Sequence, residues 1–310
     1  MMVTRLSALG RWSAGAVAAA VVAGTAAGCS GVVDRGLAGP APSAAGTTSP
    51  TPSAAGTTSP VTTAAADPAN PATWRLPMEA HLPTDEESRR FGRAMTTLVG
   101  DCMRKAGHAY SAPPELPRLG PKTLTDWRYG IHDAALSAER GYHPDAAEQA
   151  AYDAAIAKGL AAGTTGAAAE AEQACGVQSK QRLGGGDRTW GALAQTLGND
   201  AFVRSKREPE VVAAFGAWSS CMKGRGFVYK EPLDASDDRR FKGTDVSRTE
   251  IDTALADLAC RARGNVAKVW FDAEVRLQEQ ALGQRVPALQ AERRELDAAL
   301  RKSADVLAGR

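Results

Sequence analysis

The same cysteine-bearing pattern occurs twice in this chain of 310 residues. The first copy occupies residues 102–110 (CMRKAGHAY) and the second occupies residues 221–229 (CMKGRGFVY). Cysteine, methionine, a basic residue, glycine and tyrosine align between the copies without a gap. In each copy the glycine stands where a helix would end, and a Pro-containing loop and a second cysteine, Cys175 or Cys260, come later. The pattern therefore indicates an internal duplication with a diverged loop.

Helical periodicity precedes each copy of the pattern. Apolar residues recur at helical spacing between Glu86 and Lys105, and a second helix is predicted to begin at Pro209, which the first turn of a helix tolerates. The apolar positions are Phe91, Met95, Leu98, Cys102 and Met103 in the first segment, and Val211, Phe215, Trp218, Cys221 and Met222 in the second. This spacing places each cysteine on the side of its helix that faces the core.

Residues 74–310 as a whole favour helices over strands, because Ala, Leu, Glu, Gln and Arg are frequent and β-branched alternation is rare. Ser247 and Glu250 have the spacing of a capping box, and a helical period continues from there through residues 251–269. Asp145 offers another helix start. The sequence predicts an all-α domain made of two related halves, residues 74–186 and 187–310.

Near the C-terminus, Pro287 is predicted to break or kink the last helix. Apolar residues then continue along one seam, which comprises Val286, Leu289, Leu296, Leu300 and Leu307 together with Arg293. The short repeat and the arginine in it favour an amphipathic helix that packs on its own domain over a coiled coil. The glycine run 184–186 is the predicted hinge between the halves.

Four cysteines lie in the predicted helical domain, and they allow three pairings. The duplication favours Cys102 with Cys175 and Cys221 with Cys260, because each bond then joins equivalent helices of one half. Each bond would stabilise the fold by roughly 4 kcal/mol in the chain-entropy model. A zinc site is disfavoured because no C-x-x-C pair occurs and no histidine has finger spacing from a cysteine. A catalytic thiol is disfavoured because His108, the histidine nearest to Cys102, lies beyond the helix end.

Motifs of known enzymes are nearly absent. Residues 220–223 spell S-x-x-K, the nucleophile motif of penicillin-binding proteins, but the companion motifs S-D-N and K-T-G do not occur. No G-x-S-x-G, H-E-x-x-H, Walker loop or G-x-G-x-x-G occurs either. The sequence therefore predicts a non-enzymatic protein without a metal or another cofactor.

The N-terminus predicts export. Arg5 and Arg11 precede the apolar run 14–27, and the small residues at its end are followed by Cys29. The run is shorter than the roughly 20 residues that a membrane-spanning helix needs. Residues 1–28 are therefore predicted to be a signal peptide. The ending Ala-Ala-Gly-Cys resembles the lipobox of bacterial lipoproteins, although Ala26 stands where leucine is usual. That resemblance implies cleavage before Cys29 and fatty acylation of its sulfur, which explains an odd cysteine better than a spare thiol does.

A spacer is predicted between the lipid and the helices. All but four of the residues 36–73 are Ala, Gly, Pro, Ser or Thr, and the decapeptide PSAAGTTSPT at residues 42–51 is followed directly by PSAAGTTSPV. Such a segment buries too little apolar area to offset its chain entropy. Residues 29–73 are therefore predicted to be a lipidated, disordered linker with a reach of roughly 35 Å beyond the membrane.

One loop gathers most of the candidate binding residues, namely Trp127, Tyr129, His132, Asp133, Tyr142 and His143. A functional interpretation makes it a ligand-binding loop that uses aromatic stacking and His/Asp hydrogen bonds, or a weak metal site. The structural interpretation, which we prefer, makes it a loop that packs its tyrosines on the helices and leaves its histidines at the surface. The mixed-charge segment 234–245 is interpreted as a solvated loop.

Several of these motifs together resemble a group of actinobacterial lipoproteins to which no activity is assigned. They are the Cys-Met-x-x-x-Gly-x-x-Tyr pattern, the loop from Arg128 to His143, and the stretch from Glu250 to Trp270. The resemblance covers most of residues 86–300. It implies an exported, lipid-anchored helical protein and adds no catalytic residues.

The net charge of the chain disfavours nucleic acid as a binding partner. The whole chain has a formal net charge of +2, and removal of residues 1–28 takes away two arginines and no acid. A neutral mature chain is a poor binder of nucleic acid. The expected function is an envelope binding module at the outer face of the cell membrane, with a protein or cell-wall material as partner. Two alternatives are open: an accessory subunit of a transporter that docks through residues 286–307, and an envelope enzyme that uses His132 and His143.

Overall fold

The structure is a computed structural model and describes residues 67–185 and 189–310. The α-helices are α1 (Asp85–Lys105), α2 (Ala134–Arg140), α3 (Ala146–Ala161), α4 (Ala167–Arg182), α5 (Ala192–Ser205), α6 (Pro209–Gly224), α7 (Pro232–Ser236), α8 (Arg248–Gly264) and α9 (Val266–Leu307); the 3-10 helices are η1 (Pro71–Thr73), η2 (Pro77–His81) and η3 (Arg239–Phe241). In these ranges the predicted all-α class is confirmed, since an isolated bridge between Trp127 and Gly130 is the only β pairing. The predicted signal peptide, Cys29 and most of the predicted linker lie outside the described residues.

Both predicted disulfides are present. The first disulfide (Cys102–Cys175) joins α1 to α4 with a Cα–Cα distance of 5.6 Å, and the second disulfide (Cys221–Cys260) joins α6 to α8 at 5.7 Å. These separations are typical of unstrained disulfides. The related halves therefore each contain one covalent bond between two helices.

The duplicated pattern folds in the same way in both copies. Gly107 after α1 and Gly226 after α6 take positive φ angles of 80° and 91°, a conformation that glycine adopts without steric cost. The next N–H group in each copy donates to a methionine carbonyl, Met103 at 2.9 Å and Met222 at 3.0 Å. Both methionine side chains are fully buried. Each helix thus ends in a Schellman-type turn.

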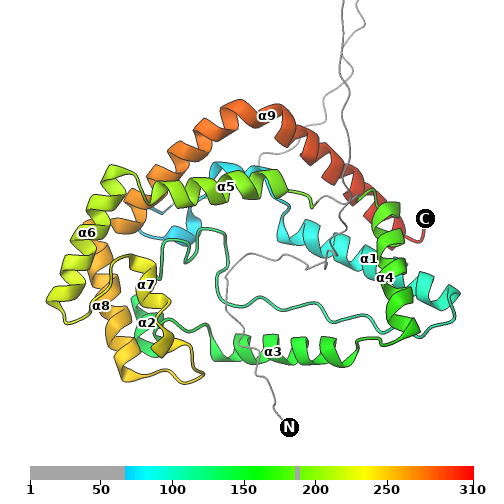
Figure 1. The fold of residues 1–310 in the computed structure, drawn as a ribbon, viewed down its shortest axis with the longest axis horizontal. Coiled ribbons are helices and arrows are strands. Elements are labelled where there is room, and N and C mark those ends of the chain that lie inside the picture. The colour runs from blue at the N-terminus through cyan, green and yellow to red at the C-terminus, as the bar shows by residue number, and fades with distance from the viewer. Residues whose placement is uncertain (1–66, 186–188) are drawn as a thin grey trace, which may run out of the picture. The chain divides into compact units, whose positions relative to one another are not determined.

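Helix α9 connects the two halves. It has 42 residues, and at a rise of about 1.5 Å per residue it extends about 63 Å. Its first part lies against α5 and α6, and its last part lies against α1 (Figure 1). Leu289 packs with Met78 and Ala194 in one cluster, and Val306 packs against the cluster of α1. The halves therefore share one compact unit, Ala65–Arg310, and none of its described helices is long and apolar enough to cross a membrane.

One predicted helix boundary was wrong, and of the break or kink predicted at Pro287 the break is absent. The helical period across residues 251–269 is interrupted at Asn265, whose φ of 47° ends α8 and lets Val266 begin α9 in a new direction. Pro287 does not break α9, which runs through it. Pro287 and Gly283 are both exposed, so water can bond the Gly283 carbonyl that loses its helical partner.

The predicted end of the linker at residue 73 was also wrong. Trp74 is buried, stacks on Phe271 with ring centroids 4.8 Å apart, and donates its indole N–H to the Asp67 carbonyl at 2.8 Å. The Thr123 hydroxyl donates to the Ala72 carbonyl at 2.9 Å. Residues 67–73 are therefore part of the folded unit, because backbone hydrogen bonds fix them and Pro71 is buried.

Arg293 lies in the apolar seam of α9 and is neutralised there by Glu87 of α1. Glu87 also belongs to a capping box with Thr84, whose N–H donates to its carboxylate at 2.8 Å. Partial burial acts to raise the pKa of Glu87, but the bonds from Arg293 and Thr84 outweigh it and the pKa is lowered from 4.5. The charged form of Glu87 is therefore favoured by folding.

We predict that Glu87→Gln lowers the free energy of unfolding at pH 7 by about 1 kcal/mol. Because the folded pKa is depressed, this contribution is complete above about pH 4.5 and is lost as pH falls through the lower folded value. Urea unfolding of the variant and the wild type from pH 7 to pH 3 should show their difference shrinking in acid. Glu86→Gln removes an exposed partner of Arg89 and serves as the control with little effect at any pH. A difference that stays constant down to pH 3 would contradict the assignment.

Candidate functional site

The six residues predicted to form a ligand loop do not share one site. Tyr129 and Tyr142 are buried in the main core cluster. Asp133 is exposed and caps α2 by accepting the Leu136 N–H at 2.9 Å. Trp127 occupies a tight turn and has a φ of 65°, which is unusual for a residue other than glycine. The two tyrosines therefore lie where the packing interpretation places them.

The first histidine of this loop is paired at short range. His132 Nε2 lies 2.8 Å from Asp126 Oδ1, and the other carboxylate oxygen accepts the Lys122 N–H at 2.6 Å. Burial acts to raise the pKa of Asp126, but the bonds from His132 and Lys122 outweigh it and lower the pKa. This pair fixes the base of the turn that carries Trp127.

The second histidine uses different partners. His143 Nδ1 lies 2.7 Å from Glu250 Oε1, and Nε2 donates to the Gly243 carbonyl at 2.9 Å. The Tyr142 N–H donates to the same Glu250 oxygen at 2.9 Å. His132 and His143 thus bind separate carboxylates, and the structure gives them no shared acid–base constellation of the kind a hydrolase requires.

Glu250 corrects the predicted capping box of α8. The Ser247 hydroxyl does accept the Glu250 N–H at 3.1 Å, but the Glu250 carboxylate turns away from Ser247 and enters the core. It is fully buried, and its Oε2 has no hydrogen-bond partner within the described residues. The loop at Tyr142 and His143 competes successfully for this carboxylate because it offers two donors.

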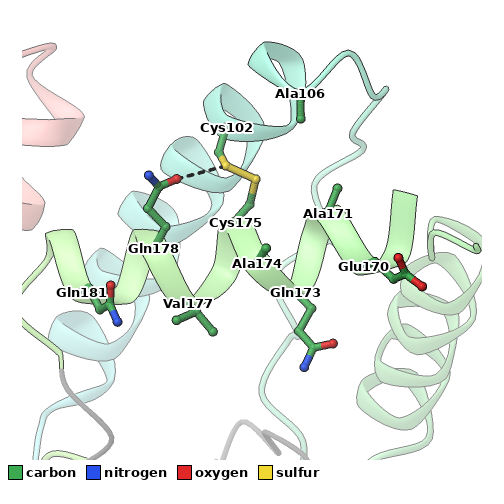
Figure 2. A pocket seen from close by; sticks show the side chains of 10 residues that line it. All are labelled: Cys102, Ala106, Glu170, Ala171, Gln173, Ala174, Cys175, Val177, Gln178 and Gln181. Carbon is green, nitrogen blue, oxygen red and sulfur yellow. Dashed lines mark hydrogen bonds between the residues drawn. A yellow bond between two sulfur atoms is a disulfide. The ribbon is translucent and has the colours of Figure 1, made fainter. Parts of the chain in front are cut away.

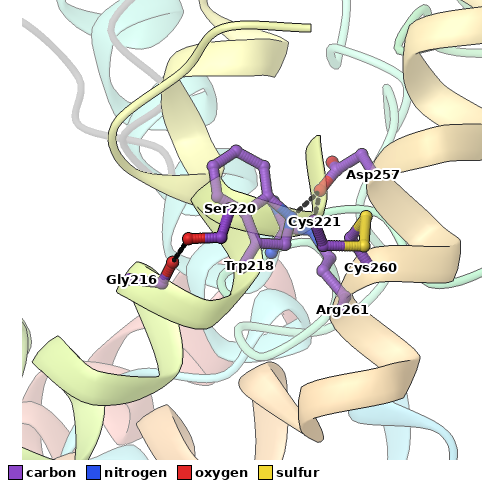
Figure 3. Close-up of a disulfide and its surroundings, with 7 residues drawn as sticks. All are labelled: Gly216, Trp218, Ser220, Cys221, Asp257, Cys260 and Arg261. Carbon is purple, nitrogen blue, oxygen red and sulfur yellow. Dashed lines mark hydrogen bonds and ion pairs between the residues drawn. A yellow bond between two sulfur atoms is a disulfide. The ribbon is translucent and has the colours of Figure 1, made fainter. Parts of the chain in front are cut away.

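A buried charge pair lies beside the second disulfide (Figure 3). Asp257 is fully buried and accepts the Arg261 Nε–H at 2.6 Å, the Trp218 indole N–H at 2.8 Å and the Tyr142 hydroxyl at 3.2 Å. Burial raises the pKa of Asp257, and these three donors oppose the shift. The carboxylate is therefore satisfied entirely by protein groups.

The guanidinium of Arg261 extends the pair into the first half. It donates to the Tyr129 carbonyl, and its Nη2 donates to the Pro232 carbonyl at 2.8 Å. Gly130 makes room for it: a Cβ added at that position would lie 2.3 Å from the guanidinium carbon, and Gly130 also has a φ of 99°. The loop of the first half is thus clamped on α8.

A second buried carboxylate binds the same loop to α9. Glu274 accepts two N–H groups of Arg128, at 2.6 and 3.0 Å, the Tyr129 hydroxyl at 2.8 Å and the Gln278 amide at 2.8 Å. Gln278 in turn accepts the Met78 N–H at 2.9 Å. Burial raises the pKa of Tyr129 well above 10. Each of these polar groups bonds to another group of the protein, so their role is to stabilise the fold.

Sequence reasoning missed Asp257, Arg261 and Glu274. A signal was present, because Asp257 and Arg261 are four residues apart on the predicted helix of Cys260, and Glu274 follows Trp270 by four residues. A charged residue on the apolar face of a helix indicates a buried partner.

The remaining catalytic candidates have structural roles. The Ser220 hydroxyl of the S-x-x-K match donates to the Gly216 carbonyl at 2.9 Å, and the neighbouring Cys221 is in the second disulfide. Among the described residues, no group of three or more His, Cys, Asp or Glu side chains is placed to hold a metal ion.

A hollow with a volume of about 720 Å³ lies at the first disulfide (Figure 2). We call it the α1–α4 hollow. Its lining is Cys102, Ala106, Glu170, Ala171, Gln173, Ala174, Cys175, Val177, Gln178 and Gln181. Alanine, valine and sulfur form its surface, amides lie at its edge, and Glu170 is its only titratable group. Val177 is 55% exposed.

The seam of α9 is largely covered. Leu289, Leu296 and Leu300 are buried against α1 and α5, whereas Val286 and Leu307, at its two ends, are partly exposed. The C-terminal helix packs on its own domain, as the preferred interpretation predicts. The transporter hypothesis stays a prediction, for which the seam leaves only its two ends, Val286 and Leu307, exposed.

Comparison with known proteins adds no family to this picture. No protein-family model matches the chain, and no curated protein and no solved structure matches it significantly. The resemblance to actinobacterial lipoproteins stays a prediction.

We predict that Gly130→Ala is far more destabilising than Gly226→Ala. Both positions have a similar positive φ, 99° and 91°, so both variants incur backbone strain of about 1–2 kcal/mol. A Cβ at Gly226 meets no atom within 4 Å, whereas one at Gly130 collides with Arg261. Displacement of Arg261 leaves Asp257 buried and unpaired, which costs about 3–5 kcal/mol. Thermal and urea unfolding should separate the two variants, and equal stabilities would refute the clamp.

Proposed function

We propose that this protein is an exported lipoprotein, anchored at the outer face of the cell membrane through acylated Cys29, whose helical domain is a non-enzymatic binding module of the envelope. The observation that carries the binding role is the α1–α4 hollow. Its apolar surface and amide rim suit an apolar segment of another envelope protein, and it holds no nucleophile with an adjacent base.

The disulfides support the exported location. Both pairs join neighbouring helices, and such bonds persist in oxidising compartments. Four buried charged side chains argue against a catalytic role, because each already bonds to another protein group. They are Asp257, Glu274, Arg128 and Arg261. A binding module needs only a rigid frame and an open surface, and this fold supplies both.

Cys29→Ser tests the anchor. If Cys29 is acylated, the variant should leave the membrane fraction and accumulate in the medium, whereas the wild type should label with a fatty-acid analogue. A double substitution, Cys102→Ser with Cys175→Ser, controls for loss of cysteines elsewhere and should retain the label. Membrane retention of Cys29→Ser with no labelling of the wild type would contradict the proposal.

A photo-crosslinking amino acid at Val177 tests the hollow. In intact cells it should give a discrete adduct with one envelope component. The matched control is Val212 on α6, which is 54% exposed against 55% for Val177 but lies outside the hollow. The same adduct at both positions, or none at Val177, would exclude the hollow as the binding surface. Turnover of an envelope substrate that His132→Ala abolishes would instead support an enzyme.

A further inference from the structure

The two disulfides have different surroundings. The first opens on the α1–α4 hollow of about 720 Å³, whose walls near the sulfurs are the methyl groups of Ala106, Ala171 and Ala174. The second opens on a hollow of about 330 Å³ that Trp218 and Arg263 border. The rate of thiol–disulfide exchange depends on access to the sulfur as well as on thiol acidity. The first disulfide thus offers more room to an attacking thiol.

The helices joined by the two disulfides also differ in the number of other helices against which they pack. Among the helices, α4 packs extensively only against α1, and α3 buries none of its residues. By contrast α6 also packs on α9, and α8 also packs on α2, α7 and α9. Trp218 and Asp257 tie α6 to α8 next to the second disulfide. Separation of α4 from α1 is a local event, whereas separation of α6 from α8 opens the main core.

From these two observations we propose that the first disulfide is a thiol-exchange site, and that a dithiol reduces it selectively and so releases α3 and α4 from α1. The reacting partner is a protein or small molecule with two neighbouring thiols. This proposal concerns the covalent state of Cys102 and Cys175 and does not depend on the proposed binding function.

The exchange proceeds in two balanced steps. A thiolate of the dithiol attacks Sγ of Cys102, which is the less buried of the two residues, and the Cys102–Cys175 bond breaks. Cys175 leaves as a thiolate and takes up the proton that the attacking thiol released. The second thiol then attacks the mixed disulfide and expels Cys102. The protein gains two thiols, and the dithiol becomes a disulfide.

Gln178 lies where it can assist this reaction. Its side-chain oxygen is 3.3 Å from Cys102 Sγ, although a disulfide sulfur carries no hydrogen to donate. A half-turn of the amide places its N–H groups at the sulfur instead, and an N–H donor stabilises a thiolate. The same side chain lines the hollow through which the dithiol arrives.

Reduction changes what the protein exposes. Leu98, Val99 and Met103 on α1 are buried, and their clusters contain Leu183 just beyond α4 or Cys175 within it. When the bond is cut, only these apolar contacts and the α3–α4 connection hold α4 in place. Release of α4 therefore presents an apolar face of α1 that the oxidised protein hides.

The order of reduction tests the proposal. The full chain carrying Cys29→Ser, which retains only the four paired cysteines, is titrated with dithiothreitol, quenched by alkylation and mapped by mass spectrometry. We expect Cys102 and Cys175 to be labelled at least about tenfold faster than Cys221 and Cys260. Equal rates, or faster labelling of the second pair, would overturn the proposal.

A matched pair of variants tests the route. Ala106→Trp, one turn after Cys102, fills the α1–α4 hollow and should slow reduction of the first disulfide, whereas Ala213→Trp, at another exposed alanine outside it, should not. If both variants react like the parent chain, the hollow is not the route and this part of the inference fails.

Hydrogen exchange tests the consequence. In the chain with Cys102→Ser and Cys175→Ser, amides of α3 and α4 should exchange faster while α6, α8 and α9 keep their protection. The chain with Cys221→Ser and Cys260→Ser is the comparison and should lose protection throughout the main core, or fail to fold. Unchanged protection of α4 in the first chain would show that the disulfide does not hold it.

Discussion

The bond between Arg261 and Asp257 is the interaction on which the arrangement of this domain depends. Both side chains are buried, so neither charge is tolerable without the other. The arginine reaches a carbonyl of the first half, and the carboxylate receives a donor from Trp218 in the second half. A single ion pair therefore fixes the loop, α6 and α8 relative to one another, and the second disulfide adds a covalent bond at the same place.

The two copies of the duplicated pattern differ in the residues that surround their disulfides. Both copies end a helix in the same turn and bond it to a second helix. In the second copy, aromatic rings and buried charges surround that bond, and Trp270 alone contacts the rings of Tyr129, Phe202 and Phe215. In the first copy the cluster around the bond contains Val99, Met103 and Tyr110, no buried ion pair of the described residues adjoins it, and a hollow remains. The second half thus contains the more extensively packed disulfide, and the first half contains the more open one.

The parts of the fold that local chemistry decides could be predicted from the sequence. Gly107 and Gly226 ended their helices as expected because the left-handed backbone there suits glycine. The cysteine pairs followed from the repeat. The break at Asn265 could not be foreseen, since the helical period of the apolar residues continues past it.

The candidate site was less predictable, because several of its side chains are held by partners far away in the sequence. The aromatic and histidine-rich loop looked like a ligand site, but its tyrosines fill the core and its histidines each meet a carboxylate. Those carboxylates are contributed partly by α8, more than 100 residues away in the chain. The α1–α4 hollow arises from small residues whose importance appears only when α1 and α4 lie together.

The disulfide connectivity is sequential: the first cysteine of the domain is bonded to the second, and the third to the fourth. For a polypeptide threaded N-terminus first into an oxidising compartment, Cys102 and Cys175 emerge and can pair before Cys221 appears. Oxidation in the order of emergence then gives the native bonds directly, with no need for isomerase-catalysed reshuffling. Helix α9 emerges last, so its docking completes both halves only after their covalent bonds are in place.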